Sequence, residues 1–128
     1  LKTRTFGTDF FDSVEENRAS GGAMTGAEFV AQYVDPEFTK RYVKLNGNDL
    51  QVSSAAVGYE TASLIGRSLA GADKVPTADE MVQALRKNGT QSAGATEYKW
   101  IDAGECTGFE VKNVMKRMEK NRVVEISK

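Results

Sequence analysis

Histidine is absent from the sequence, and Cys106 is its only cysteine. Without histidine the chain lacks the commonest acid–base group at neutral pH and the commonest metal ligand, which excludes most hydrolase triads and most transition-metal sites. A single cysteine can form neither an internal disulfide nor a zinc site built from several thiolates. Any catalysis would have to rely on carboxylate, lysine or tyrosine chemistry, or on Cys106 itself.

Long apolar runs and a strong charge imbalance are missing as well. No run approaches the roughly 18–20 apolar residues that cross a bilayer, so we expect no transmembrane segment. Lysine and arginine number 17 against 18 acidic residues, a net charge of −1. Nucleic-acid binders normally carry a basic excess, so we expect no nucleic acid as partner. A chain of 128 residues is expected to form a single domain over residues 1–128.

Capping boxes, in which Ser or Thr is followed three residues later by Glu, indicate where helices begin. They occur at Ser13/Glu16, Thr25/Glu28, Thr77/Glu80 and Thr107/Glu110. The last three are each followed by apolar residues at helical spacing. Before the first pair, apolar and acidic residues indicate a helix that already begins near Thr8.

Two more helices are expected in the middle of the chain. Asp35-Pro36 places proline at the first position of a helix that Gly47 ends. The apolar stripe of this helix is Phe38, Tyr42 and Leu45. A longer helix over about residues 53–70 is rich in small residues, and a ridge of them would let another helix approach closely. This ridge is Gly58, Ala62 and Gly66.

The C-terminal quarter predicts one more helix and two extended segments. Thr107 opens the helix, whose apolar stripe is Val111, Val114, Met115 and Met118. Residues 97–101 and 123–126 are expected to be extended and to be able to pair as a short two-stranded ribbon. The sequence therefore predicts a mainly α fold, a single domain of about five or six helices with room for this ribbon near the C-terminus.

Two features near the C-terminus allow a functional interpretation beside a structural one. Cys106 precedes the predicted helix start, where the helix dipole can lower a thiol pKa. No imidazole is present to activate it, so we expect packing on Val111 and no catalysis. A basic helix face is expected either to be solvated or to dock an acidic partner. It consists of Lys112, Lys116, Arg117, Lys120 and Arg122.

Residues 21–30 read Gly-Gly-Ala-Met-Thr-Gly-Ala-Glu-Phe-Val, and Phe38, Lys40, Arg41 and Tyr42 follow. This order resembles phycobilisome linker domains, in which a capped acidic-aromatic-aliphatic triplet opens one helix and aromatic and basic residues follow on the next. Leu64-Ile65-Gly66-Arg67 is similar to the family's Leu-Leu-Gly-Arg segment, and Thr96-Glu97-Tyr98 to its Ser-x-Glu-Tyr ending. The resemblance covers about residues 10–100. The predicted C-terminal helix and tail, residues 104–128, have no counterpart, and those linkers are typically basic.

The resemblance implies an all-helical, non-enzymatic scaffold that docks to phycobiliproteins and organises them in a light-harvesting antenna. It also implies a location at the thylakoid membrane surface of a chloroplast or cyanobacterium, on the stromal or cytoplasmic side. The partner-binding positions that it implies are Glu28, Phe29, Phe38, Lys40, Arg41, Tyr42 and Arg67. Because a cysteine carries a bilin in some linkers of red algae, Cys106 gains bilin attachment as a second functional interpretation. No other cofactor and no metal is expected.

Two alternatives stay open beside the linker. One is an unrelated, soluble intracellular helical adaptor or assembly subunit of another protein complex. The other is a small enzyme that uses Cys106 or carboxylates, which the missing histidine disfavours.

Overall fold

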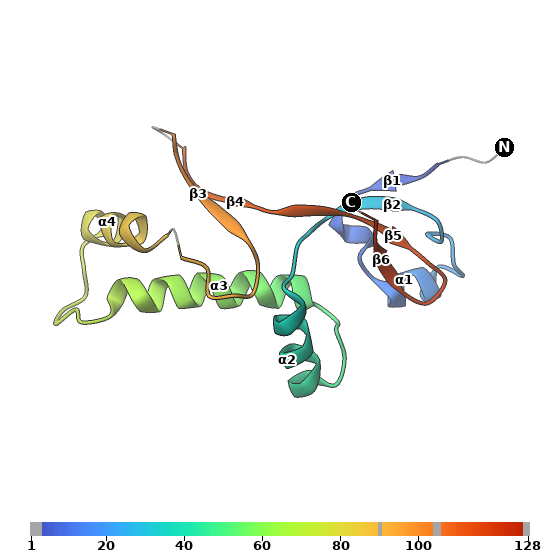
Figure 1. The fold of residues 1–128 in the computed structure, drawn as a ribbon, viewed down its shortest axis with the longest axis horizontal. Helices are drawn as coiled ribbons and strands as arrows, with labels where there is room; N and C mark the ends of the chain where they lie inside the picture. Colours follow the sequence, from blue (N-terminus) through green and yellow to red (C-terminus); the bar gives the residue numbers. More distant parts are fainter. Residues whose placement is uncertain (1–3, 90, 104–105, 127–128) are drawn as a thin grey trace. The chain divides into compact units, whose positions relative to one another are not determined.

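The computed structural model describes residues 4–89, 91–103 and 106–126. The chain forms two compact units (Figure 1). Unit 1 comprises Leu1–Tyr33 and Asn113–Lys128, and unit 2 comprises Val34–Lys112. Unit 2 is therefore an insertion between two strands of unit 1, and the chain passes twice from one unit to the other.

The fold is mixed α/β, so the prediction of a mainly α domain with five or six helices is wrong. Within the described ranges there are four α-helices, a four-stranded sheet and a two-stranded hairpin. The sheet belongs to unit 1, whereas three of the four helices and the hairpin belong to unit 2.

The sheet of unit 1 has the strand order β1-β2-β5-β6. Its strands are β1 (Phe6–Gly7), β2 (Glu28–Gln32), β5 (Asn113–Met118) and β6 (Val123–Glu125). β1 runs parallel to β2, and the other two pairs are antiparallel. In the central pair, β2 with β5, Ala31 lies opposite Val114, so the sheet joins two segments that are far apart in the sequence.

One face of this sheet carries the core of unit 1. Phe29, Ala31 and Met118 are buried there, at 1%, 2% and 0% exposure. A 3-10 turn, η1 (Asp9–Phe11), and helix α1 (Val14–Ala19) contribute Phe11 and Val14 to the same core. Ser13 caps α1 by accepting a hydrogen bond from the Glu16 backbone N–H at 3.2 Å.

A fully buried asparagine, Asn17, joins three segments of unit 1. Its Nδ2 donates to Thr25 Oγ1 at 3.1 Å and to the Lys120 carbonyl at 3.4 Å. Its Oδ1 accepts from the Met24 backbone N–H at 3.0 Å. The side chain therefore links α1 to the loop before β2 and to the turn between β5 and β6.

Two predicted helices are strands in the structure. The segment after Thr25 is β2, and the segment after Thr107 lies in β4 (Cys106–Val111) and continues into β5. Gly26 has φ +90°, which no helix adopts and which favours glycine. Each strand is also held by a partner strand, β2 by β5 and β4 by β3 (Tyr98–Ala103). These pairings outweigh the local capping pattern.

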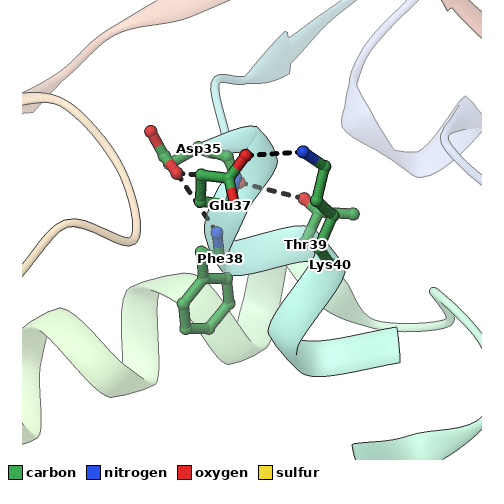
Figure 2. A network of polar contacts seen from close by, with 5 residues as sticks. All are labelled: Asp35, Glu37, Phe38, Thr39 and Lys40. Carbon is green, nitrogen blue, oxygen red and sulfur yellow. Dashed lines mark hydrogen bonds and ion pairs between the residues drawn. The ribbon is translucent and has the colours of Figure 1, made fainter. Parts of the chain in front are cut away.

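The three helices expected in the middle of the chain are present in unit 2. They are α2 (Pro36–Asn46), α3 (Val52–Leu69) and α4 (Ala78–Asn88), with α4 beside the C-terminal half of α3 (Figure 1). Asp35 Oδ1 caps α2 by accepting from the N–H groups of Glu37 and Phe38 at 2.8 and 3.1 Å (Figure 2). Gly47, at φ +78°, ends this helix.

Both predicted extended segments are extended, but they do not pair with each other. β3 pairs antiparallel with β4, with Tyr98 opposite Val111 and Ala103 opposite Cys106. β6 pairs with β5 in the other unit. The predicted ribbon is therefore wrong in its pairing, because a strand pattern alone does not specify the partner.

The core of unit 2 forms where α2 meets the first half of α3. Phe38, Ala56 and Ala95 are buried there. The Phe38 ring lies 5.4 Å from the Tyr59 ring and 6.4 Å from the Tyr42 ring, between centroids. Leu45, expected on the same stripe, is 85% exposed and lies in the last turn of α2, two residues before Gly47.

Candidate partner-binding site

Two of the predicted partner-binding residues, Glu28 and Phe29, lie in β2 of unit 1. Phe29 is only 1% exposed and packs edge-on against Phe11, with centroids 6.3 Å apart. Glu28 accepts from Arg117 Nη2 at 2.7 Å and from Arg4 Nη2 at 2.8 Å. These hydrogen bonds, first from Arg117 and then from Arg4, lower the pKa of Glu28. Both residues therefore contribute to the internal structure of unit 1.

The predicted aromatic anchors of α2 also have internal partners. Phe38 is 7% exposed and forms part of the unit 2 core. Tyr42 is half-buried, and its hydroxyl donates to the Leu50 carbonyl at 2.7 Å, across the loop from α2 to α3. A partner would meet little of either ring.

The basic residues of α2 remain at the surface. Figure 2 shows Lys40 turned toward Glu37, with Nζ 2.5 Å from Oε1. This hydrogen bond raises the pKa of Lys40. Arg41 is exposed and places its guanidinium 5.8 Å from the centre of the Phe38 ring. Arg41 and Lys44 are therefore exposed cations that a partner could reach.

Arg67, the last of the predicted residues, is half-buried near the C-terminal end of α3. Its Nη2 donates to the Gln91 carbonyl at 2.6 Å, which also accepts from the Tyr98 hydroxyl at 2.6 Å. Arg67 lies eleven residues along α3 from Ala56, the core residue that packs against α2. At 1.5 Å per residue this separation is roughly 16 Å. Two of the seven predicted residues therefore lie in unit 1 and five in unit 2, and within unit 2 Arg67 is distant from the α2 residues.

The sequence did not predict the role of Glu60, a buried side chain of unit 2 that makes several hydrogen bonds. It is 6% exposed in the middle of α3 and accepts four hydrogen bonds. The donors are Ser92 Oγ at 2.7 Å and the backbone N–H groups of Ala93 at 2.6 Å, Ala95 at 2.7 Å and Thr96 at 3.2 Å. Burial by itself raises the pKa of Glu60, but these hydrogen bonds outweigh burial and the net pKa is lowered.

Glu60 fixes the loop over residues 92–96 onto α3 and so positions the start of β3. A buried carboxylate is stable only when its oxygens are hydrogen-bonded or paired, and here backbone N–H groups provide most of the bonds. The signal for it was present in the sequence: in the apolar, small-residue segment 52–69, only Glu60 and Arg67 are charged. A lone acid in such a segment indicates a buried structural role.

The side of α3 away from its core residues is exposed and carries no charge. We call it the α3 outer face; its members are Gly58, Thr61, Ala62, Ile65, Gly66 and Leu69. The buried residues Ala56, Glu60 and Leu64 point the other way. Ile65 is 42% and Leu69 37% exposed. A Cβ placed on Gly58 or Gly66 would meet nothing within 4 Å, so the small-residue ridge expected from the sequence is uncovered.

The predicted basic face near the C-terminus does not exist as one surface, because its residues lie in and around β5 and not on a helix. Four of its five members pair with acids: Lys112 with Glu97 at 2.9 Å, Lys116 with Asp12 at 2.6 Å, Arg117 with Glu28 at 2.7 Å, and Arg122 with Glu119 at 2.7 Å. These pairs neutralise most of the charge that was expected to attract an acidic partner.

Cys106 is the first residue of β4, so the prediction that it precedes a helix is wrong. The argument that a helix dipole lowers its pKa no longer applies. The surroundings of its side chain lie outside the described part of the structure, and bilin attachment at Cys106 stays a prediction.

Metal ligands and membrane-spanning helices are two further features that could indicate a function. Over 4–89, 91–103 and 106–126, no three Cys, Asp or Glu side chains are grouped so that they could hold a metal ion. In the same ranges, none of the helices has the length and apolar character needed to cross a membrane.

Comparison with known proteins gave no match. No protein family, no curated protein and no solved structure matches this chain.

Proposed function

We propose that this protein is a non-enzymatic protein-binding subunit and that its partner packs on the α3 outer face. The observation that carries the proposal is a helix of 18 residues whose exposed side has no charged residue. Surface helices normally place charged and polar side chains outward, whereas a helix that is apolar all round is normally buried. An exposed apolar surface of this kind is typical of an interaction site.

The glycines of the α3 outer face support the same proposal. A glycine inside a helix costs about 0.5–1 kcal/mol relative to alanine. Gly58 and Gly66 have neither a positive φ nor a close neighbour that would require glycine. A partner whose backbone approaches closely at these positions would explain their presence.

The α3 outer face also indicates the chemistry of the partner. An uncharged surface with Ile65 and Leu69 fits an apolar patch of another protein segment, and binding should depend little on salt.

Phycobiliproteins are the partner that the sequence resemblance favours, in an antenna at a thylakoid surface. Their generally acidic surface suits Arg41 and Lys44. The all-helical fold implied by the resemblance is contradicted, so the support for this partner is restricted to short matching segments. We therefore propose the general function, an adaptor or assembly subunit, ahead of the specific one.

The proposal can be tested by photo-cross-linking. A benzoylphenylalanine placed at Ile65 should form a discrete product with one polypeptide of the native source, and the same probe at Gln83, exposed on α4, should not. The polypeptide, once purified, should bind the wild-type chain equally well at low and high salt. Equal products from both positions, or none from Ile65, would contradict the proposal. If the cross-linked polypeptide carries no bilin, the proposed phycobiliprotein partner is wrong, but the α3 outer face is still the docking surface.

A further inference from the structure

We propose that Asn46 is a site of spontaneous deamidation and that this modification loosens the end of α2. The chain contains two Asn-Gly pairs, Asn46-Gly47 and Asn88-Gly89, and each lies at the C-terminal end of a helix. Glycine after asparagine favours deamidation because no side chain hinders its backbone nitrogen. The two sites share this dipeptide but differ in their surroundings.

The reaction proceeds through a cyclic imide. The Gly47 backbone nitrogen attacks Cγ of Asn46 and forms a C–N bond, while the Cγ–Nδ2 bond breaks and the side-chain nitrogen leaves as ammonia with the proton of the backbone amide. Water then opens the ring at either carbonyl, which gives aspartate or isoaspartate. Water is the only co-reactant, and nothing is oxidised or reduced.

The local structure at Asn46 offers little protection against this reaction. Asn46 is exposed, and its Nδ2 makes one hydrogen bond, to the Tyr42 carbonyl at 3.0 Å. The Gly47 N–H donates to the Val43 carbonyl at 2.8 Å, so the attack requires opening of the last turn of α2. The ends of helices open at low free-energy cost, which makes the reactive geometry accessible.

Asn88 is better protected. It is half-buried, and its Nδ2 lies 2.9 Å from the Ala84 carbonyl and 3.4 Å from Ser68 Oγ on α3. Gly89, whose nitrogen would attack, is buried. Opening this site requires separating α4 from α3, so it should react more slowly than Asn46.

Deamidation of Asn46 would weaken the last turn of α2 for two reasons. A carboxylate cannot donate to the Tyr42 carbonyl, and its negative charge lies at a helix C-terminus, where the dipole disfavours anions. The same turn carries Tyr42, whose hydroxyl bonds to Leu50 across the loop to α3. The modification therefore acts on the link between the two helices.

The test is peptide mapping by mass spectrometry of the intact chain, aged at mildly alkaline pH. Isoaspartate and aspartate should accumulate at Asn46 well before Asn88. In a parallel sample kept in denaturant, the two sites should react at similar rates, because only the folded structure distinguishes them. Equal rates in the folded chain, or faster reaction at Asn88, would overturn the proposal.

The structural consequence can be measured on variants. Asn46→Asp should lower the melting temperature. Asn48→Asp adds the same charge, loses only the longer bond from Nδ2 to the Asn46 carbonyl at 3.4 Å, and keeps the Oδ1 that accepts from the Leu50 N–H at 3.0 Å. Asn48→Asp should therefore have a smaller effect. Equal effects would show that charge alone matters and would overturn the proposed loosening of α2.

Discussion

At the scale of single residues, two buried polar side chains, Glu60 and Asn17, join parts of the chain that are separate in the sequence. Glu60 fixes the loop over residues 92–96 to α3, and Asn17 joins α1 to two loops of unit 1. Neither was a predicted site. The partners of Glu60 lie 32 or more residues away, and one partner of Asn17 lies 103 residues away, and such contacts leave no local pattern. The sequence nevertheless marks Glu60 as unusual by its apolar surroundings.

Replacing Glu60 by Gln should destabilise unit 2 by about 2–3 kcal/mol, because one amide –NH2 would then face backbone N–H donors. Chemical denaturation of wild type and variant measures the difference. As a control, Thr61→Ala changes the neighbouring exposed position of α3 and should leave the free energy of unfolding nearly unchanged. A Glu60→Gln variant as stable as wild type would contradict the role of the carboxylate.

The contribution of Glu60 to the free energy of unfolding should also depend on pH. The folded pKa lies below the ordinary value of 4.5, so the folded state favours the ionised form. The stabilisation is therefore complete above about pH 4.5 and is lost as the pH falls through the folded pKa. The gap in melting temperature between wild type and Glu60→Gln should shrink over this acidic range; a gap that stays constant would show that ionisation is irrelevant.

Replacing Asn17 by Ala should destabilise unit 1 by about 2–3 kcal/mol, because the Met24 N–H and the Lys120 carbonyl would lose their buried partner. Asn17→Asp should cost at least as much, because both donated bonds are lost and the second carboxylate oxygen would be buried against the Lys120 carbonyl. The hydrogen-exchange rate of the Met24 amide measures directly whether its bond to Asn17 Oδ1 is present. Unchanged protection in Asn17→Ala would show that the buried network is not stabilising.

At the scale of elements, helices with local signals and the extended segments at β3 and β6 could be predicted, whereas the pairing of the strands and the strand character of β2, β4 and β5 could not. α2 has Asp35, Pro36 and Gly47 at its ends, and α4 has the Thr77/Glu80 capping box, so both were correctly placed from sequence. β2 and β5 follow capping-box patterns of the same kind, yet they form strands because they pair with each other. A pairing partner more than 80 residues away is invisible to any local pattern.

The methionines of β5 distinguish the strand from the predicted helix. On a helix Met115 and Met118 would share one buried face, whereas on the strand they point to opposite faces of the sheet. Met118 is 0% exposed in the core, and Met115 is half-buried on the other side. Met118→Ala should therefore cost about 2–4 kcal/mol and Met115→Ala clearly less, as measured by urea denaturation. Equal costs would support the helix.

At the scale of the whole molecule, composition correctly indicated the absence of an apolar segment long enough for a membrane, in agreement with the described helices. It could not reveal that the chain forms two compact units, one inserted in the other. That organisation depends on the long-range pairing of β2 with β5. Part of the predicted partner-binding site was wrong because this long-range pairing could not be predicted. Glu28 and Phe29 were expected on a helix surface, but both lie in β2, and Phe29 is buried in the core of unit 1.

The α3 outer face should bind a partner and should not contribute to the stability of the chain itself. Two adjacent residues separate these roles: Leu64 is 3% exposed in the interior, and Ile65 is 42% exposed on the outer face. Leu64→Ala should lower the free energy of unfolding by about 2–4 kcal/mol. Ile65→Asp should leave it nearly unchanged, because the new charge stays in water.

The most direct measurement compares the binding of the wild-type and Ile65→Asp chains to the partner identified by cross-linking at Ile65, by analytical ultracentrifugation at matched concentrations. We expect the wild-type chain to sediment with its partner and the Ile65→Asp chain to sediment alone, with an unchanged melting temperature. An Ile65→Asp chain that retains wild-type affinity would show that the partner binds elsewhere and would contradict the account.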